Sequence, residues 1–366
     1  MYFLSALAGV ALLIAQLAVP ADGERAFLSR VRRLTVEGAR AGEGYWSPDG
    51  RRLVFQSERE PANPFYQIFV LDLASGDVKR ISPGTGKTTC AFFRPGTDQI
   101  LFSSTHDDPR SVQLQQDELA FRASGQQRRY AWDYDEAMDI YAFSETTGRL
   151  ARLTTARGYD AEASYSPDGE WVVFSSTREA YTGTLSDTEQ KALATDPSYF
   201  GEIYLMRADG TDVRRLTHVP GYDGGPFFTH DGARIVWRRF DERGLIADVW
   251  TMKPDGTDAR QVTDFGAMSW APYEHPSGEY VFFASNKLGF ENFELFIVDA
   301  GGTKEPVRAT FTDGFDGLPV PSPDGTMLAW TSTRGGGSGG QIYLAGWNHE
   351  HARAALRSAP PRRNRP

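Results

Sequence analysis

The sequence contains a single cysteine, Cys90, among its 366 residues. A disulfide within the chain is therefore excluded, and a zinc site built from several thiolates is excluded with it. Basic residues are also in deficit, because 39 Lys and Arg stand against 48 Asp and Glu, for a formal net charge of −9. Since nucleic acids bind basic surfaces, this balance argues against nucleic acid as the partner.

Long apolar runs are rare as well, and the one candidate lies at the start of the chain, over residues 4–18. Small residues follow it, with Val19 and Ala21 at the positions that a signal peptidase reads. Residues 1–21 are therefore interpreted as a signal peptide, which predicts a periplasmic or secreted protein. The run lacks a preceding Lys or Arg, and an uncleaved membrane anchor is the alternative.

What the sequence does have is a repeat. The tetrapeptide Ser-Pro-Asp-Gly stands at 47–50, 166–169 and 322–325, and weaker copies stand at 94–97, 229–232 and 275–278. Successive copies lie about 47 residues apart, except where two insertions lengthen the interval. Each copy has a short apolar run before it, two β-rich runs after it, then an Asp-Gly turn or its equivalent and a closing polar run. Pro, Asp and Gly suit the corners of tight turns, so each unit predicts four antiparallel strands.

Four strands per repeat of this length indicate a propeller blade. We predict an all-β, six-bladed propeller over 31–348. Its blades are placed at 43–82, 86–154, 158–217, 221–263, 266–310 and 314–348. The sixth unit lacks a good fourth strand, and residues 31–35 repeat the sequence Val-Arg-Arg-Leu-Thr of 213–217. We therefore expect 31–35 to complete the last blade, with 354–358 as a weaker alternative. A basic, Pro-rich tail at 349–366 is expected to be disordered, and the alternative is an electrostatic tether to an anionic envelope.

The tetrapeptide and the Arg-Arg-Leu-Thr strand resemble the TolB-like propeller repeat, a WD40-like unit, over residues 31 to about 347. The resemblance implies the fold strongly and the function weakly. TolB itself carries an α/β domain ahead of its propeller, and that domain contacts inner-membrane partners. Here about nine residues separate the expected cleavage site from the first strand, a departure that puts a role as the Tol-Pal component in doubt.

A repeated acidic motif precedes three of the turns. Asp160, Asp223 and Asp316 each follow an aromatic residue, respectively Tyr159, Tyr222 and Phe315. Glu162 lies two residues after the first of them, and Glu43 holds the matching position in blade one. All belong to strand-start loops on one propeller face, so we expect them at the channel mouth. A ring of carboxylates there would attract a basic peptide or a cation such as calcium. The alternative is that each Asp fixes its own loop by accepting backbone N–H bonds.

Two insertions, 105–135 and 179–201, lie on that same face and are interpreted as a lid, or alternatively as cover for a blade edge. Ser186 and Glu189 form a capping-box pattern that predicts a helix, and Pro197 is expected to stop it. The first insertion contains a candidate set for a metal or a sugar ring, with simple surface or capping roles as the alternative. Its members are His106, Asp107, Asp108, Trp132, Asp133 and Asp135.

The sequence contains no recognisable catalytic set. Gly86-Lys87-Thr88 lacks the first glycine of a phosphate-binding loop, and 336–340 matches a nucleophile elbow only by letter, since it is expected between two strands. We therefore expect a monomeric, non-catalytic protein that binds an envelope protein, peptide or glycan. Two alternatives stay open: a propeller that assists a separate peptidase, and a metal-dependent polysaccharide lyase.

Overall fold

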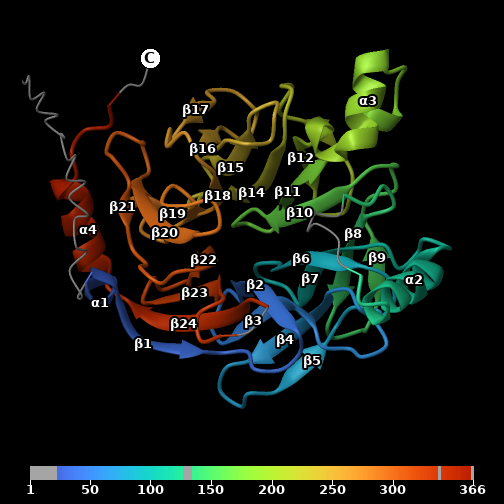
Figure 1. The fold of residues 1–366 in the computed structure, drawn as a ribbon, viewed down its shortest axis with the longest axis horizontal. Coiled ribbons are helices and arrows are strands. Elements are labelled where there is room, and N and C mark those ends of the chain that lie inside the picture. Colours follow the sequence, from blue (N-terminus) through green and yellow to red (C-terminus); the bar gives the residue numbers. More distant parts are fainter. Residues whose placement is uncertain (1–22, 127–133, 337–338, 364–366) are drawn as a thin grey trace, which may run out of the picture.

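The computed structural model describes residues 23–126, 134–336 and 339–363, and these form six four-stranded antiparallel sheets around a centre (Figure 1). Blade one contains β2 (Arg40–Trp46), β3 (Arg52–Glu58), β4 (Gln67–Asp72) and β5 (Val78–Arg80). Blade two contains β6 (Thr88–Phe93), β7 (Gln99–Ser104), β8 (Asp139–Ser144) and β9 (Leu150–Arg152). Blade three contains β10 (Asp160–Tyr165), β11 (Trp171–Ser176), β12 (Glu202–Arg207) and β13 (Arg214–Arg215).

Blade four contains β14 (Asp223–Phe228), β15 (Ile235–Phe240), β16 (Ala247–Met252) and β17 (Arg260–Gln261). Blade five contains β18 (Ser269–Glu274), β19 (Tyr280–Ser285), β20 (Glu294–Asp299) and β21 (Val307–Arg308). Blade six contains β22 (Asp316–Pro321), β23 (Met327–Ser332) and β24 (Gln341–Trp347), with β1 (Leu28–Arg33) at its edge. The prediction of six four-stranded blades is confirmed. Every tetrapeptide joins the first two strands of its blade.

The fourth strands of blades one to five are only two or three residues long, and in every blade a hydroxyl in or just after the fourth strand attaches it to the third strand. Thr217, for example, accepts the backbone N–H of Ile203 at 2.9 Å and donates to the carboxylate of Glu202. The matching residues in the other blades are Thr35, Ser82, Thr154, Thr263 and Thr310. Thr35 makes these bonds to Ile342 and Gln341 of blade six, just beyond β1.

The ends of the described chain pack together on the outer edge of blades five and six. Helix α1 (Gly23–Phe27) lies against α4 (His349–Ser358), and Phe27 stacks on Trp347 with ring centroids 5.6 Å apart (Figure 1). Ala352 and Leu356 are buried. The expectation of disorder was therefore wrong for 349–358. One apolar face of this stretch packs on the propeller, and Asn348 caps its first turn by accepting the N–H of His351.

Both insertions form helical elements, as expected. The first contains α2 (Ser111–Ala123), and the second contains η1 (Arg178–Tyr181), α3 (Asp187–Thr195) and η2 (Pro197–Phe200). Ser186 caps α3 in a complete capping box with Glu189, which confirms that prediction. Across the described part of the chain, none of these helices has the length and apolar character needed to cross a membrane.

Candidate functional site in the central channel

The innermost strand of every blade carries the same irregularity. Two residues of the first strand oppose one residue of the second, which is a β-bulge, and the first bulged residue has a positive φ of 51–57°. Only one of the six positions is glycine, so five residues adopt a conformation that favours glycine. All six line a cavity on the propeller axis. They are Glu43, Cys90, Glu162, Gly225, Ala271 and Leu318.

Aromatic side chains close the channel one layer further along the strands. Tyr45, Phe92, Phe227 and Tyr273 hold the positions two residues after the bulge in four blades, and their rings contact one another with centroids 4.9–6.3 Å apart. The cavity left above this layer measures about 30 Å³. That is room for a water molecule or two, or for the tip of one side chain.

A buried ion pair occupies one side of the cavity. Arg238 of β15 donates to Glu162 at 2.7 Å and to the Tyr222 hydroxyl at 2.9 Å, and that hydroxyl donates to Glu162 at 2.5 Å. The backbone N–H of Gly225 also donates to Glu162 at 2.6 Å. The carboxylate of Glu162 is thus fully engaged. A Cβ at position 225 would clash with the guanidinium of Arg238, so the glycine of the bulge makes room for the arginine.

Glu43 faces the same cavity without such support. Its side chain is 5% exposed, and its Oε2 has no hydrogen-bond partner among the described residues. Burial raises the pKa of Glu43 from 4.5 to about 7, an effect that a hydrogen bond with Cys90 opposes and that the charge of Glu162 reinforces. The channel therefore holds two carboxylates and one guanidinium, and one of the carboxylates lacks a cation.

The three predicted aspartates begin β10, β14 and β22, where each is at most 1% exposed and pairs with an arginine of its own blade. Asp160 accepts from Arg178 at 2.7 Å, Asp223 accepts from Arg239 at 2.6 Å, and Asp316 accepts from Arg334. Burial raises the pKa of Asp160 to about 6, against the attraction of Arg178. These carboxylates therefore lie inside their blades with charged partners. A ring of free carboxylates, as the sequence predicted, would lack such partners. The alternative expected backbone N–H groups as the donors, whereas the donors found here are mainly side chains.

The aromatic residues that precede these aspartates differ in role. Tyr222 belongs to the Glu162 network. Tyr159 is 1% exposed and packs edge-on against Tyr134 with centroids 5.2 Å apart. Phe315 is partly buried and contacts the ring of Trp270, which itself lines the channel cavity.

The candidate set in the first insertion does not join the channel residues. His106 lies 2.9 Å from the Ser104 hydroxyl and against the ring of Tyr141, whose hydroxyl donates to Asp107. Burial lowers the pKa of His106. Asp108 accepts from Arg110, and Asp135 accepts from Lys87, while Trp132 and Asp133 lie outside the described residues.

The calcium expectation finds no set of donor side chains among the residues that the structure describes. Among the described residues, no three His, Cys, Asp or Glu side chains converge as a metal site would require. Glu162 already accepts three hydrogen bonds. Calcium binding stays an untested prediction.

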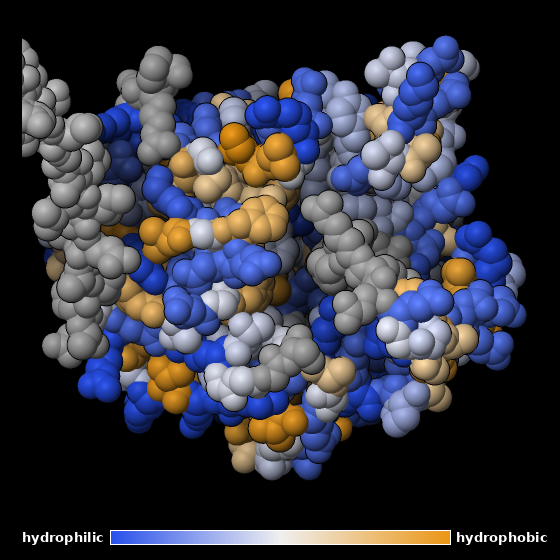
Figure 2. Space-filling model, viewed as in Figure 1, coloured by the Kyte–Doolittle hydropathy of each residue, from blue (hydrophilic) through white to orange (hydrophobic). Residues whose placement is uncertain are grey.

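The loops around this face are chemically uneven. Figure 2 shows hydrophilic residues over α2 and α3 and hydrophobic residues gathered over the β15–β20 side. Leu245, Leu288 and Phe290, at the tips of two neighbouring strand connections, are 58%, 51% and 72% exposed. Exposed apolar side chains are thus more numerous on the β15–β20 side of this face, while α2 contributes Val112, which is 53% exposed.

Of the residues in the channel, the sequence patterns predict Glu43, Glu162 and Tyr222 but not Arg238, Cys90 or the aromatic layer. The spacing from the tetrapeptides could have predicted Cys90 and the aromatic layer, because the bulge residues lie four positions before each tetrapeptide and the aromatic residues lie two positions before it. Arg238 could not be found this way, because it belongs to a second strand and reaches the channel only through the gap left by Gly225.

No protein-family model matches the chain. By sequence it is similar to the Atu1656 protein of Agrobacterium fabrum, with 27% identity over 216 residues that cover 54% of this chain and 64% of that protein. It is also similar to the TolB homolog of Chlorobium luteolum, with 28% identity over 122 residues that cover 27% of this chain and 28% of the homolog. The matches therefore span less than two thirds of each relative.

Solved structures extend the comparison over most of the chain. A TolB structure from Agrobacterium tumefaciens matches with a TM-score of 0.58 and 19% identity, over 87% of this chain and 94% of that one. TolB from Acinetobacter baumannii matches with a TM-score of 0.56 and 17% identity, over 85% and 64%. An oligogalacturonate lyase from Vibrio parahaemolyticus matches with a TM-score of 0.52 and 11% identity, over 88% and 94%. At these identities the likeness concerns the fold.

Proposed function

Because the chain has the TolB-like six-bladed propeller fold, we propose that it is a non-catalytic binding protein of the cell envelope. It receives a basic side chain of a partner protein or peptide in the channel mouth. The envelope location is supported by the TolB likeness and by the expected signal peptide at 1–21.

One observation carries the proposal, namely the unpartnered carboxylate oxygen of Glu43 in the channel cavity. Ionised Glu43 and Glu162 contribute two negative charges, and Arg238 contributes one positive charge. A buried charge without a counter-ion destabilises a fold by several kcal/mol, on the order of 3–5 when a partner is removed. A lysine or arginine side chain from a partner would supply the missing cation. The cavity, at about 30 Å³, admits only the tip of such a side chain.

The uneven face favours a protein or peptide partner over a glycan. Leu245, Leu288 and Phe290 present apolar surface in the connections between the second and third strands of blades four and five, and exposed apolar groups on a face with a polar centre are typical of protein contacts. The lyase alternative rests on fold likeness alone. It expected a second metal ligand within reach of His106. The carboxylate of Asp107 does lie 3.5 Å from the His106 Nε2, but among the described residues no third His, Cys, Asp or Glu side chain joins them.

The test is a binding measurement with a matched pair of variants. Anisotropy of fluorescein-labelled lysine- and arginine-containing peptides from an array would be followed with the wild type, Glu43→Gln and Glu170→Gln. Glu170 is exposed on the opposite face. We expect Glu43→Gln to weaken binding at least about tenfold and Glu170→Gln to leave it unchanged. Equal affinity of wild type and Glu43→Gln, or cleavage of the peptides or of oligogalacturonate, would refute the proposal.

A further inference from the structure

The outer edge of blade six is basic, although the protein as a whole has a net charge of −9. The edge strand β1 and the helix α1 before it contain four arginines, and all of them are exposed: Arg25, Arg30, Arg32 and Arg33. The carboxylates on either side of this group, Glu24 and Glu37, pair with arginines that lie outside it. The positive charge of the edge is therefore not neutralised by its nearest carboxylates in the sequence.

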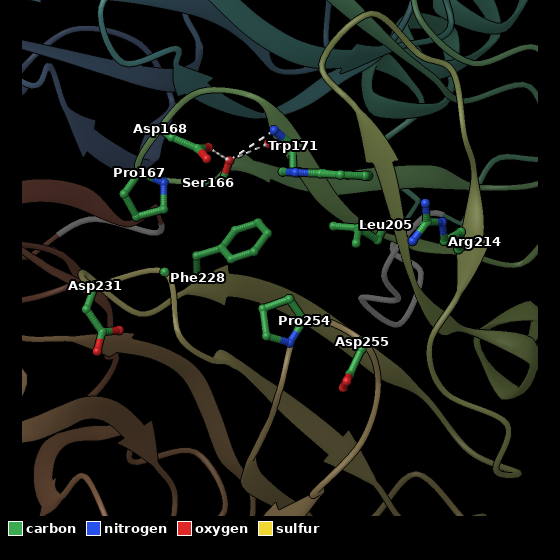
Figure 3. Close-up of a pocket in the computed structure, with 11 residues that line it drawn as sticks. Ser166, Pro167, Asp168, Trp171, Leu205, Arg214, Phe228, Asp231, Pro254 and Asp255 are labelled. Atoms are coloured by element: carbon green, nitrogen blue, oxygen red, sulfur yellow. Dashed lines mark hydrogen bonds between the residues drawn. The ribbon is translucent and has the colours of Figure 1, made fainter.

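Blade three contains the same strand with its charges neutralised. Residues 213–217 and 31–35 share the sequence Val-Arg-Arg-Leu-Thr and hold matching positions in their blades. Arg214 donates to Asp212, two residues before it, with its Nε 2.9 Å from the carboxylate. The same guanidinium lies over the Trp171 ring, 5.4 Å from the centroid, at the edge of the cleft shown in Figure 3. The first arginine of this strand thus has both an anion and an aromatic ring as partners.

Both partners are replaced in blade six. Arg30 takes the position of Asp212 and has the same left-handed conformation, since φ is 52° at Arg30 and 54° at Asp212. Aspartate tolerates this conformation better than arginine does. Met327 takes the position of Trp171 at the start of the second strand. Arg32, which matches Arg214, therefore has a second guanidinium in place of the carboxylate, and none of the described carboxylates pairs with it.

The second arginine of the strand has also lost its counter-ion. Arg215 donates to Glu202 at 2.7 Å, and blades two and five contain the same kind of pair. Arg33, which matches Arg215, has Gln341 at the position of the carboxylate, and this uncharged side chain accepts from the hydroxyl of the same strand. Three neighbouring guanidiniums of β1 are thus left without a carboxylate partner among the described residues.

We infer that the outer edge of blade six is a docking surface for an anionic phospholipid membrane. Successive residues of an extended strand lie about 3.3 Å apart, so the arginines are spread along the edge and suit a plane of phosphate groups. Guanidiniums bind phosphate oxygens in pairs. Val31 and Val36, which are 39% and 71% exposed, add apolar side chains that suit the boundary between headgroups and acyl chains.

The negative charge of the rest of the protein does not oppose this docking at close range. At physiological salt, charges more than about 8 Å apart are largely screened, so the local charge of the edge decides the interaction. Each basic residue near an anionic membrane surface improves the affinity roughly fivefold. The inference is independent of the proposed function, because this edge shares no residue with the channel.

The test measures sedimentation of the whole protein with phospholipid vesicles. We expect binding to vesicles of equal parts phosphatidylcholine and phosphatidylglycerol, an affinity that falls as salt rises, and no binding to phosphatidylcholine alone. Arg30→Asp introduces the residue type of blade three, removes one cation and supplies a carboxylate for Arg32. It should weaken binding at least about tenfold without lowering the melting temperature. Adding Gln341→Glu, which supplies the counter-ion of Arg33, should weaken binding about fivefold further.

Arg149→Asp is the matched control. Arg149 is exposed and holds the position of Arg30 in blade two, just before β9, so this variant changes the net charge equally at another edge. It should leave vesicle binding unchanged, as should Glu43→Gln, which tests the channel separately. The inference is overturned if both kinds of vesicle bind equally, or if Arg30→Asp has no larger effect than Arg149→Asp. It is also overturned if anionic vesicles fail to bind while fluorescein-labelled polyglutamate binds, which would mark an acidic protein partner.

Discussion

Replacing Glu43 by glutamine is expected to stabilise the protein at alkaline pH. The folded protein raises the pKa of Glu43 from 4.5 to about 7, chiefly through burial. Between these two values the unfolded chain releases the proton first, so the free energy of unfolding falls as pH rises through this window. At about 1.36 kcal/mol per pH unit, the ionised Glu43 costs about 3 kcal/mol above pH 7. Glutamine has nearly the same shape and no charge, so it removes that cost.

Urea unfolding of wild type and Glu43→Gln at pH 4 and pH 8 measures the effect. We expect similar free energies of unfolding at pH 4 and a difference of about 3 kcal/mol in favour of the variant at pH 8. With an unfolding entropy of about 2.1 cal/mol/K per residue, the melting temperature would rise by about 4 °C. Glu170→Gln, at an exposed position, serves as the control. A variant that is no more stable than the wild type at pH 8 would refute the view that Glu43 lacks a counter-ion.

Three further predictions concern other buried polar groups. Arg238→Met should lower the free energy of unfolding in urea by about 3–5 kcal/mol, because it leaves the buried carboxylate of Glu162 without its cation. Adding Glu162→Gln should recover most of this loss. A double variant as unstable as the single one would contradict the prediction. His275, whose Nδ1 accepts the N–H of Ser277, has a pKa lowered to about 4 by burial, so stability should fall by up to about 3 kcal/mol as pH drops from 6.5 to 4. His275→Phe should flatten that dependence, and an unchanged pH profile would argue against it. Thr217→Val should cost about 1–2 kcal/mol by leaving the Ile203 N–H unbonded, whereas Thr195→Val on exposed α3 should change the urea midpoint little.

Local patterns in the sequence predicted the strands well because each depends on neighbouring residues. The tetrapeptides at 47–50 and 166–169 form the expected turns, in which Ser47 donates to Asp49 and Ser166 donates to Asp168. The capping box at Ser186 and Glu189 likewise formed as expected. The hydrogen bonds of turns and helix caps join residues three or four positions apart, so the local sequence is sufficient to predict these turns and caps.

The tail was misjudged for a related reason. Composition suggested disorder for 349–366, yet α4 forms because its apolar face finds a complementary surface at Phe27 and Trp347. Those partners lie at the two ends of the chain. The composition of a segment describes its own residues only. It contains no information about the surface of the folded protein on which the segment packs.

By itself, the sequence determined the number of blades, the four strands of each and the location of the turns, because turn formation and strand alternation are local and are repeated six times. Tertiary structure alone decided which carboxylates are free. Asp160 and Glu43 both precede a tetrapeptide, yet Asp160 meets Arg178 while Glu43 finds no cation. The pairing of buried charges depends on side chains that neighbouring strands and blades bring together in the folded protein, and the spacing of residues along one strand does not reveal those partners.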